Sequence, residues 1–270
     1  TTMPTGRKAT QVATGAGTTC LLMDDGTVYC WSFSASHIPM AMTMPSDKTV
    51  KQLDVADGKP CAIMSDDNLW CWPKSHTALP TQVTMPNNLK VKQVSMHFYG
   101  QCVILYDDNI YCWGVGAHNS ILGFGDGTKG AKNGPTAVTM PTVDGNPLTA
   151  KQVYATARAT CAVMSDDNIY CFGLKGNMPF SSTGGIGILI PTAADMPTVN
   201  SVTLKAKQTS ANCAIMDDDN LYCWSGSTPT LVTMPNNLKV KKVVDKTDEQ
   251  TCVIAENDAL YCWGKNYDGQ

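Results

Sequence analysis

The chain has 270 residues, 43% of them hydrophobic, so it can bury a sizeable core and is neither disordered nor collagen-like. Its net charge of −3 argues against a nucleic-acid partner, because such a partner favours a basic face that releases counterions from phosphates. The longest apolar run, residues 186–191, contains glycine and proline and is too short to span a membrane. We therefore expect no membrane span.

Six copies of one pattern run along the chain, and each copy has two cysteines separated by nine residues. An alternating segment, a cluster of turn residues and a second alternating segment predict a β-hairpin in every copy. A three-residue loop, centred on Asp25 or Asp66, places the two cysteines opposite each other. One residue of this loop must adopt the left-handed backbone conformation. Gly26 adopts it easily, and in other copies an Asp or the following Asn, such as Asp67 or Asn68, must adopt it. The hairpins span residues 20–30, 61–71, 102–112, 161–171, 213–223 and 252–262.

Zinc binding and disulfide bonds compete as interpretations of the cysteines. Zinc sites usually gather cysteines at C-x2-C spacing and would need ligands from two hairpins here. Opposed cysteines on neighbouring strands are close enough to join, so we expect disulfides and no metal site. Six disulfides indicate an oxidising compartment: secreted, cell-surface, periplasmic or lumenal. The expected pairs are Cys20–Cys30, Cys61–Cys71, Cys102–Cys112, Cys161–Cys171, Cys213–Cys223 and Cys252–Cys262.

Each hairpin is apolar on both faces. A sheet buried on both faces needs neighbours on both sides, which favours blades stacked around an axis. In the second copy one face carries Cys61, Ile63, Leu69 and Cys71, and the other carries Ala62, Met64, Trp70 and Trp72.

A Met-Pro element followed by a Lys/Gln-rich strand also recurs. The copies at 84–94 and 233–243 differ at one position, which indicates duplication. The first cysteines are spaced 41, 41, 59, 52 and 39 residues apart, a period that suits a blade of about four strands. The late lysines 239, 241, 242 and 246 alternate along such a strand and are interpreted as a solvated face.

The two ends of the chain test whether the ring closes. Cys223 and Met234 are eleven residues apart, and the 8 residues after Cys262 plus the 3 up to Met3 also make eleven. We therefore expect one all-β domain over 1–270, a six-bladed β-propeller closed by the N-terminal segment. The alternative is a segment of a longer array.

The repeat resembles that of the regulator of chromosome condensation family, whose members are β-propellers. The residues that carry the resemblance are GTTCLLMDDGTVYCW at 17–31, YCWG at 111–114 and GFGDGT at 123–128. The classical propeller of that family has seven longer blades, and its nucleotide-exchange residues have no match here. The paired cysteines resemble extracellular and bacterial members, which bind other proteins.

Catalysis has little support, so we expect no enzyme and no cofactor. The four histidines share no motif with a nucleophile or carboxylate. The acidic hairpin tips are compatible with calcium binding, but turn chemistry explains them more simply. The aromatic residue after each second cysteine would suit a sugar-binding platform, yet its repeated position favours interblade core.

Two long insertions, 114–138 and 173–195, occupy equivalent places in successive blades and should project from the same side. Apolar residues among glycines there suggest a surface for a protein partner, and a loop folded over its own propeller would have the same sequence. We expect an extracellular or lumenal protein-interaction or structural module, part of a larger assembly; the alternative is a carbohydrate-binding propeller with a glycan ligand. The candidate contact residues are Ile121, Leu122, Phe124, Met178, Phe180, Ile186, Ile188, Leu189 and Ile190.

Overall fold

The computed structural model divides into two compact units, residues 1–107 and 108–270, which are described separately. The single domain expected over the whole chain stays a prediction. The predicted closure by the N-terminal segment involves residues 1–5 and 265–270, which lie outside the described residues. The structure describes residues 6–15, 17–32, 36–74, 78–115, 124–156, 159–174, 187–210, 212–247 and 250–264.

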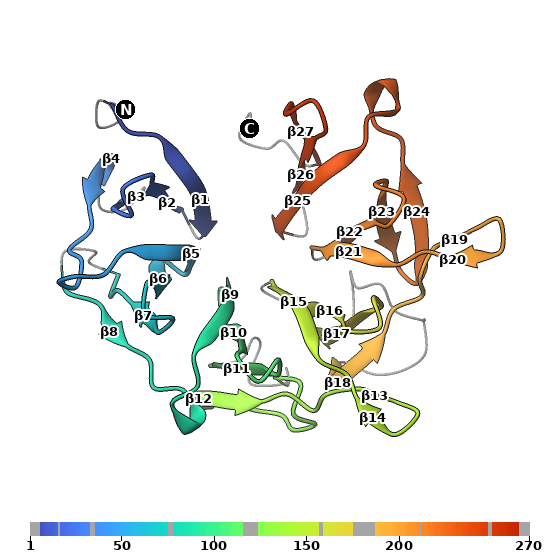
Figure 1. Cartoon of the computed structure of the whole chain (residues 1–270), viewed down its shortest axis with the longest axis horizontal. Coiled ribbons are helices and arrows are strands. Elements are labelled where there is room, and N and C mark those ends of the chain that lie inside the picture. The colour runs from blue at the N-terminus through green and yellow to red at the C-terminus, as the bar shows by residue number, and fades with distance from the viewer. Residues whose placement is uncertain are drawn as a thin grey trace. The chain divides into compact units, whose positions relative to one another are not determined.

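Within these residues the strands form six antiparallel blades, so the chain is an all-β, six-bladed β-propeller, as predicted (Figure 1). The first unit contains β1 to β10, and the second contains β11 to β27. The first strands of the blades are β1 (Ala9–Gly15), β5 (Val50–Ala56), β9 (Val91–His97), β15 (Ala150–Ala155), β21 (Ala206–Thr209) and β25 (Val240–Thr247). The second strands are β2 (Thr18–Met23), β6 (Lys59–Met64), β10 (Gly100–Leu105), β16 (Ala159–Met164), β22 (Cys213–Met216) and β26 (Gln250–Ala255).

The third strands complete the predicted hairpins, and fourth strands follow in five blades. Among the described residues the sixth blade has three strands. The third strands are β3 (Val28–Ser32), β7 (Leu69–Cys71), β11 (Ile110–Gly114), β17 (Ile169–Leu174), β23 (Leu221–Ser225) and β27 (Leu260–Gly264). The fourth strands are β4 (Ser36–Ala41), β8 (Thr81–Gln82), β12 (Lys132–Ala137), β18 (Gly187–Ala193) and β24 (Thr228–Val232).

Among the described residues, four of the connections that follow a Met-Pro element contain a short hairpin or a single helical turn. Two are small hairpins, and their exposed turns leave the path of the blades. Two are single turns of 3-10 helix that begin at the proline. The hairpins are β13 (Thr142–Val143) with β14 (Asn146–Pro147) and β19 (Thr198–Val199) with β20 (Val202–Thr203), and the turns are Pro86–Asn88 and Pro235–Asn237.

The cysteines face each other as the spacing predicts. Cys161 pairs in register with Cys171, and their Cα atoms are 4.0 Å apart. The left-handed loop residue is the aspartate rather than the asparagine that follows: Asp67 has a φ of 61°, and Gly26 takes this place in the first blade with a φ of 81°. All twelve cysteines are disulfide-bonded.

Successive blades pack face to face within each unit. We call the side of a blade that carries the cysteines its forward face and the opposite side its rear face. In the second unit Ile215 and Leu221, on the forward face of the fifth blade, share one buried cluster with Val243 and Val253 of the sixth. In the first unit Trp72 on the rear face of the second blade packs with first-blade residues. The rear face of the fifth blade, with Ala214, Met216 and Trp224, is buried in a second cluster, so both faces of this blade are core, as the sequence predicts.

In both units, a glutamine on a first strand links its blade to the next one by its side-chain amide. Gln52 Nε2 donates to the carbonyl oxygen of Val94 at 3.0 Å, and the N–H of Val94 donates to Gln52 Oε1 at 3.2 Å. We call this pair of bonds the glutamine clasp. Gln208 forms it with Val243 at 3.3 and 3.2 Å. The clasp satisfies a donor and an acceptor of the neighbouring strand at once.

Candidate functional site

The described parts of the two insertions, 124–138 and 187–195, touch each other in the second unit. The N–H of Gly127 donates a hydrogen bond to the carbonyl oxygen of Leu189 at 3.0 Å. The turn at residues 125–128 of the first insertion therefore lies on strand β18 of the second. We call these two segments together the insertion surface.

The turn at 125–128 is held by one carboxylate. Asp126 Oδ1 accepts the N–H of Thr128 at 3.1 Å, and Lys132 Nζ lies 2.6 Å from Asp126 Oδ2. Partial burial would raise the pKa of Asp126, but hydrogen bonds from Lys132 and Thr128 outweigh it and lower that pKa. Gly125 has a φ of 82°, and a Cβ there would lie 2.8 Å from Val138. The turn is fixed by its charge pair and needs glycine at 125.

The candidate contact residues divide between core and surface. Phe124 is buried, so its side chain is not exposed to a partner. Ile188 is partly buried and packs against the core cluster of the fourth and fifth blades, and Leu189 is also partly buried. Ile190 is 48% exposed. The remaining candidates, Ile121, Leu122, Met178, Phe180 and Ile186, lie outside the described residues.

The acidic hairpin tips are occupied by turn bonds and ion pairs. Asp66 Oδ1 accepts the N–H of Asn68 at 3.1 Å, and Lys51 Nζ lies 2.6 Å from Asp67 Oδ1. Equivalent ion pairs recur in the second unit as Lys151–Asp167, Lys207–Asp219 and Lys241–Asp258. The turn interpretation of these carboxylates therefore has direct structural support. Within the described ranges, His, Cys, Asp and Glu side chains form no group of three that would hold a metal ion.

The charge on Asp66 has a measurable consequence for stability. Partial burial would raise its pKa, but hydrogen bonds from Lys48 at 2.5 Å and from Asn68 outweigh it and lower the pKa to about 2. Because the folded pKa lies below the ordinary value, this carboxylate stabilises the fold above about pH 4 and loses that contribution as the pH falls toward 2.

We expect Asp66→Asn to reduce the loss of stability at acid pH. The urea midpoint of the wild type, followed by tryptophan fluorescence, should fall between about pH 4 and pH 2 more steeply than that of the variant. Lys48→Met should flatten the same limb, because it removes the principal donor. Equal slopes in wild type and Asp66→Asn would show that the ion pair does not form in solution.

The repeated aromatic residues are mostly core. Trp72, Trp113, Phe172 and Trp224 are buried. Trp72 Nε1 donates to the carbonyl oxygen of Thr43 at 2.8 Å and so anchors the segment that leads into its own blade. Trp31 is partly buried, and Trp263 of the sixth blade is exposed.

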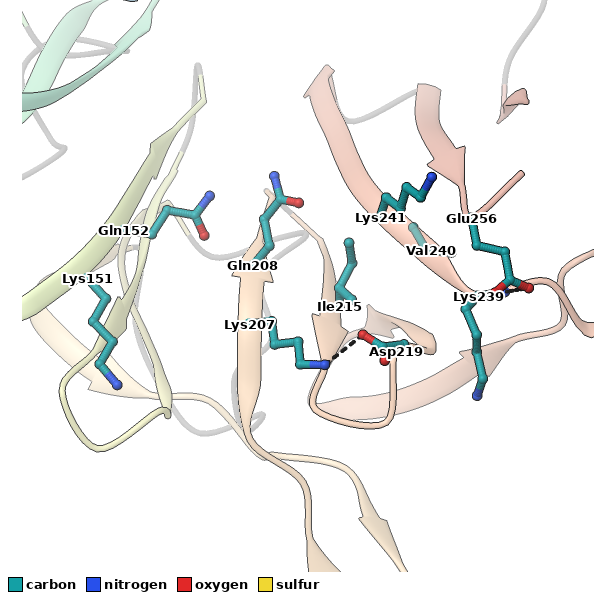
Figure 2. Close-up of a pocket in the computed structure, with 10 residues that line it drawn as sticks. All are labelled: Lys151, Gln152, Lys207, Gln208, Ile215, Asp219, Lys239, Val240, Lys241 and Glu256. Carbon is teal, nitrogen blue, oxygen red and sulfur yellow. Dashed lines mark hydrogen bonds and ion pairs between the residues drawn. The ribbon is translucent and has the colours of Figure 1, made fainter. Parts of the chain in front are cut away.

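A pocket of about 700 Å³ lies between the first strands β15, β21 and β25 of the second unit (Figure 2). Lysines line it, yet Figure 2 shows Lys207 turned to Asp219, 2.6 Å away, and Lys241 lies 2.8 Å from Asp258. Gln208, also in the wall, is used in the clasp. Sequence reasoning missed this pocket because three blades build it; the only signal was the recurring Lys-Gln pair on the first strands. Lys151 is also ion-paired, with Asp167, and Lys239 Nζ donates to the carbonyl oxygen of Asp218 at 2.9 Å and to Asn220 Oδ1 at 2.8 Å, so all four lysines have partners within the chain.

These observations define the class of the protein as a disulfide-linked, six-bladed β-propeller. Residues 9–35 and 251–270 match the model of the Regulator of chromosome condensation (RCC1) repeat, which confirms the predicted resemblance. No curated protein matches the chain by sequence. In the described residues no helix is long and apolar enough to cross a membrane.

Three solved structures share the fold at low identity. Human WBSCR16 is 15% identical, with a TM-score of 0.81 over 99% of this chain and 79% of that one. Prp20p of Saccharomyces cerevisiae is 15% identical, with a TM-score of 0.72 over 94% and 71%. The CRINKLY WD40 ectodomain of the Arabidopsis thaliana receptor kinase ACR4 is 18% identical, with a TM-score of 0.60 over 96% and 83%.

Proposed function

We propose that the chain is a protein-interaction module of an extracellular or lumenal compartment, and that the insertion surface contacts its partner. The observation that carries this proposal is the Gly127–Leu189 hydrogen bond, which joins two insertions from different blades and leaves Ile190 exposed beside it. Ile190 lies on strand β18, and an exposed apolar side chain on a strand that a neighbouring turn supports suits binding. The mechanism is passive: packed blades hold the insertions, and the insertions make the contact.

The disulfides and the fold neighbours support the location and the class. Twelve disulfide-bonded cysteines suit an oxidising compartment. One structure with the same fold is a receptor-kinase ectodomain, and another, Prp20p, is described with binding to Gsp1p and histones. Neither neighbour identifies the partner of this chain. The proposal includes no catalytic step.

A photo-crosslinking residue at position 190 tests the contact. The protein that carries this residue is incubated without reductant in an extracellular or lumenal extract of the source organism. We expect it to crosslink to one protein, which mass spectrometry identifies. An excess of unlabelled Ile190→Asp protein should fail to compete for that crosslink. The matched control carries the crosslinker at position 143, an exposed valine on the β13–β14 hairpin of the same unit. Equal crosslinking at both positions would contradict the proposal, and free thiols in native protein would contradict the compartment.

Carbohydrate binding is the second candidate, because Trp263 is an exposed aromatic ring of the repeat. A glycan panel distinguishes the two. Binding that Trp263→Ala removes, together with no crosslink at position 190, would favour the carbohydrate ligand.

A further inference from the structure

The chain has one Asn-Gly step, Asn133–Gly134, and it lies in the described part of the first insertion. At such a step the side-chain amide of the asparagine is within reach of the next backbone nitrogen, and glycine adds no side chain that would hinder the approach. The space around Gly134 is open, because a Cβ there would meet no atom within 4 Å beyond its two chain neighbours. Asn133 itself is exposed. The step therefore has the local chemistry of spontaneous deamidation.

The strand ladder does not hold this step in place. β12 is an end strand of its sheet, and it advances from residue 132 to 136 where β11 advances only from 114 back to 112. Asn133 and Gly134 lie in the resulting bulge and have no paired residue on β11. Pro135 follows and has no N–H that could add a ladder bond. A backbone outside the ladder keeps the freedom to reach the bent geometry that ring closure needs, which a regular strand denies.

We propose that Asn133 is a modification site, at which the insertion surface acquires a carboxylate by deamidation. The backbone nitrogen of Gly134 attacks Asn133 Cγ and forms a new C–N bond, which closes a cyclic succinimide. The side-chain amide nitrogen takes up the proton that the backbone nitrogen loses and leaves as ammonia. One water molecule then adds to either ring carbonyl and opens the ring, to aspartate or to isoaspartate. Water is the only co-reactant, so the reaction needs no oxidant and no cofactor.

The new carboxylate is next in sequence to the charge pair that fixes the turn at 125–128. Lys132 Nζ lies 2.6 Å from Asp126 Oδ2 and donates to Thr128 Oγ1 at 2.7 Å. A carboxylate at position 133 competes with Asp126 for this ammonium group. Isoaspartate also adds a methylene group to the backbone of β12, which moves Lys132 relative to the turn. Both products therefore weaken the bonds that hold the turn.

The turn carries the contact between the two insertions, the hydrogen bond from Gly127 to Leu189. Deamidation at position 133 therefore loosens the insertion surface as the protein ages. The tests below measure mass and hydrogen exchange, so their outcome does not depend on a partner at Ile190.

Ageing of the oxidised chain at neutral and mildly alkaline pH, followed by peptide mapping with mass spectrometry, tests the modification. We expect Asn133 to deamidate within about threefold of its rate in a peptide of residues 129–138, because the bulge opens at little free-energy cost. Asn146, an exposed asparagine of the same unit, is the control and should stay intact, because Pro147 has no N–H to attack with. Deamidation at least about tenfold slower in the folded chain than in the peptide would overturn the proposal, because the fold would then protect the step.

Hydrogen exchange at the Gly127 N–H tests the effect on the insertion surface. It should be faster in aged than in fresh wild type, and unchanged on ageing in Asn133→Gln, which keeps an amide one methylene further from the backbone. Asn133→Asp, which carries the new charge from the start, should exchange faster than Asn133→Gln. Position 133 is exposed, so both variants should fold, which circular dichroism checks. Equal exchange in fresh and fully deamidated wild type would overturn the proposed effect on this surface.

Discussion

Trp72→Ala is expected to lower the free energy of unfolding by about 3 to 5 kcal/mol. The side chain is buried in the cluster shared by the first and second blades, and its indole N–H holds the carbonyl of Thr43 at 2.8 Å. Truncation therefore removes apolar contacts between two blades and leaves a cavity that the neighbouring strands cannot fill. Urea unfolding followed by near-ultraviolet circular dichroism measures the loss.

Trp72→Phe is the matched control, because the fourth blade naturally has Phe172 at this position, also buried. It keeps an aromatic ring and removes the indole N–H, so we expect a loss of about 1 to 2 kcal/mol. Similar losses in the two variants would mean that the hydrogen bond to Thr43, rather than packing, holds the interface.

Replacing both Cys161 and Cys171 by alanine is expected to lower the free energy of unfolding by roughly 2 to 3 kcal/mol through the entropy of an eleven-residue loop. Both cysteines are fully buried, so lost packing adds to this figure. The thermal midpoint under oxidising conditions, compared with that of the unmodified chain, measures the change.

The double substitution of Cys252 and Cys262 is the control for loop entropy. Its loop has the same length, but Cys252 is partly buried and Cys262 is exposed, so the loss should be smaller. Equal losses at the two hairpins would assign the stabilisation to the loop alone. No loss at Cys161 and Cys171 would contradict a role of the disulfide in stability.

Local geometry was predictable because it depends on residues close in sequence. Nine residues between cysteines allow a three-residue loop and direct opposition, and Cys161 does oppose Cys171. The identity of the left-handed residue was open between Asp67 and Asn68, since both types tolerate that conformation. The structure assigns it to Asp67, while Asp66 accepts the N–H of Asn68.

Contacts between blades were not predictable residue by residue. The Lys-Gln pair was visible as a repeat, but the bond from Gln52 to Val94 joins positions 42 residues apart. The candidate contact residues show the same limit. Phe124 and Ile190 are both apolar residues near glycines, yet one is buried and the other exposed, because the packing of the two insertions decides which side faces inward.

The glutamine clasp also favours changes of chain length by whole repeats. Each amide is made by one repeat and satisfied by the strand of the following repeat, so Gln52 depends on Val94 and Gln208 on Val243. If a whole repeat is inserted or deleted, each clasp glutamine still faces the first strand of a following repeat. If only part of a repeat is inserted or deleted, one glutamine amide and one strand lose their hydrogen-bond partners. Duplication in whole repeats, as in the near-identical segments 84–94 and 233–243, is therefore the change that this architecture tolerates.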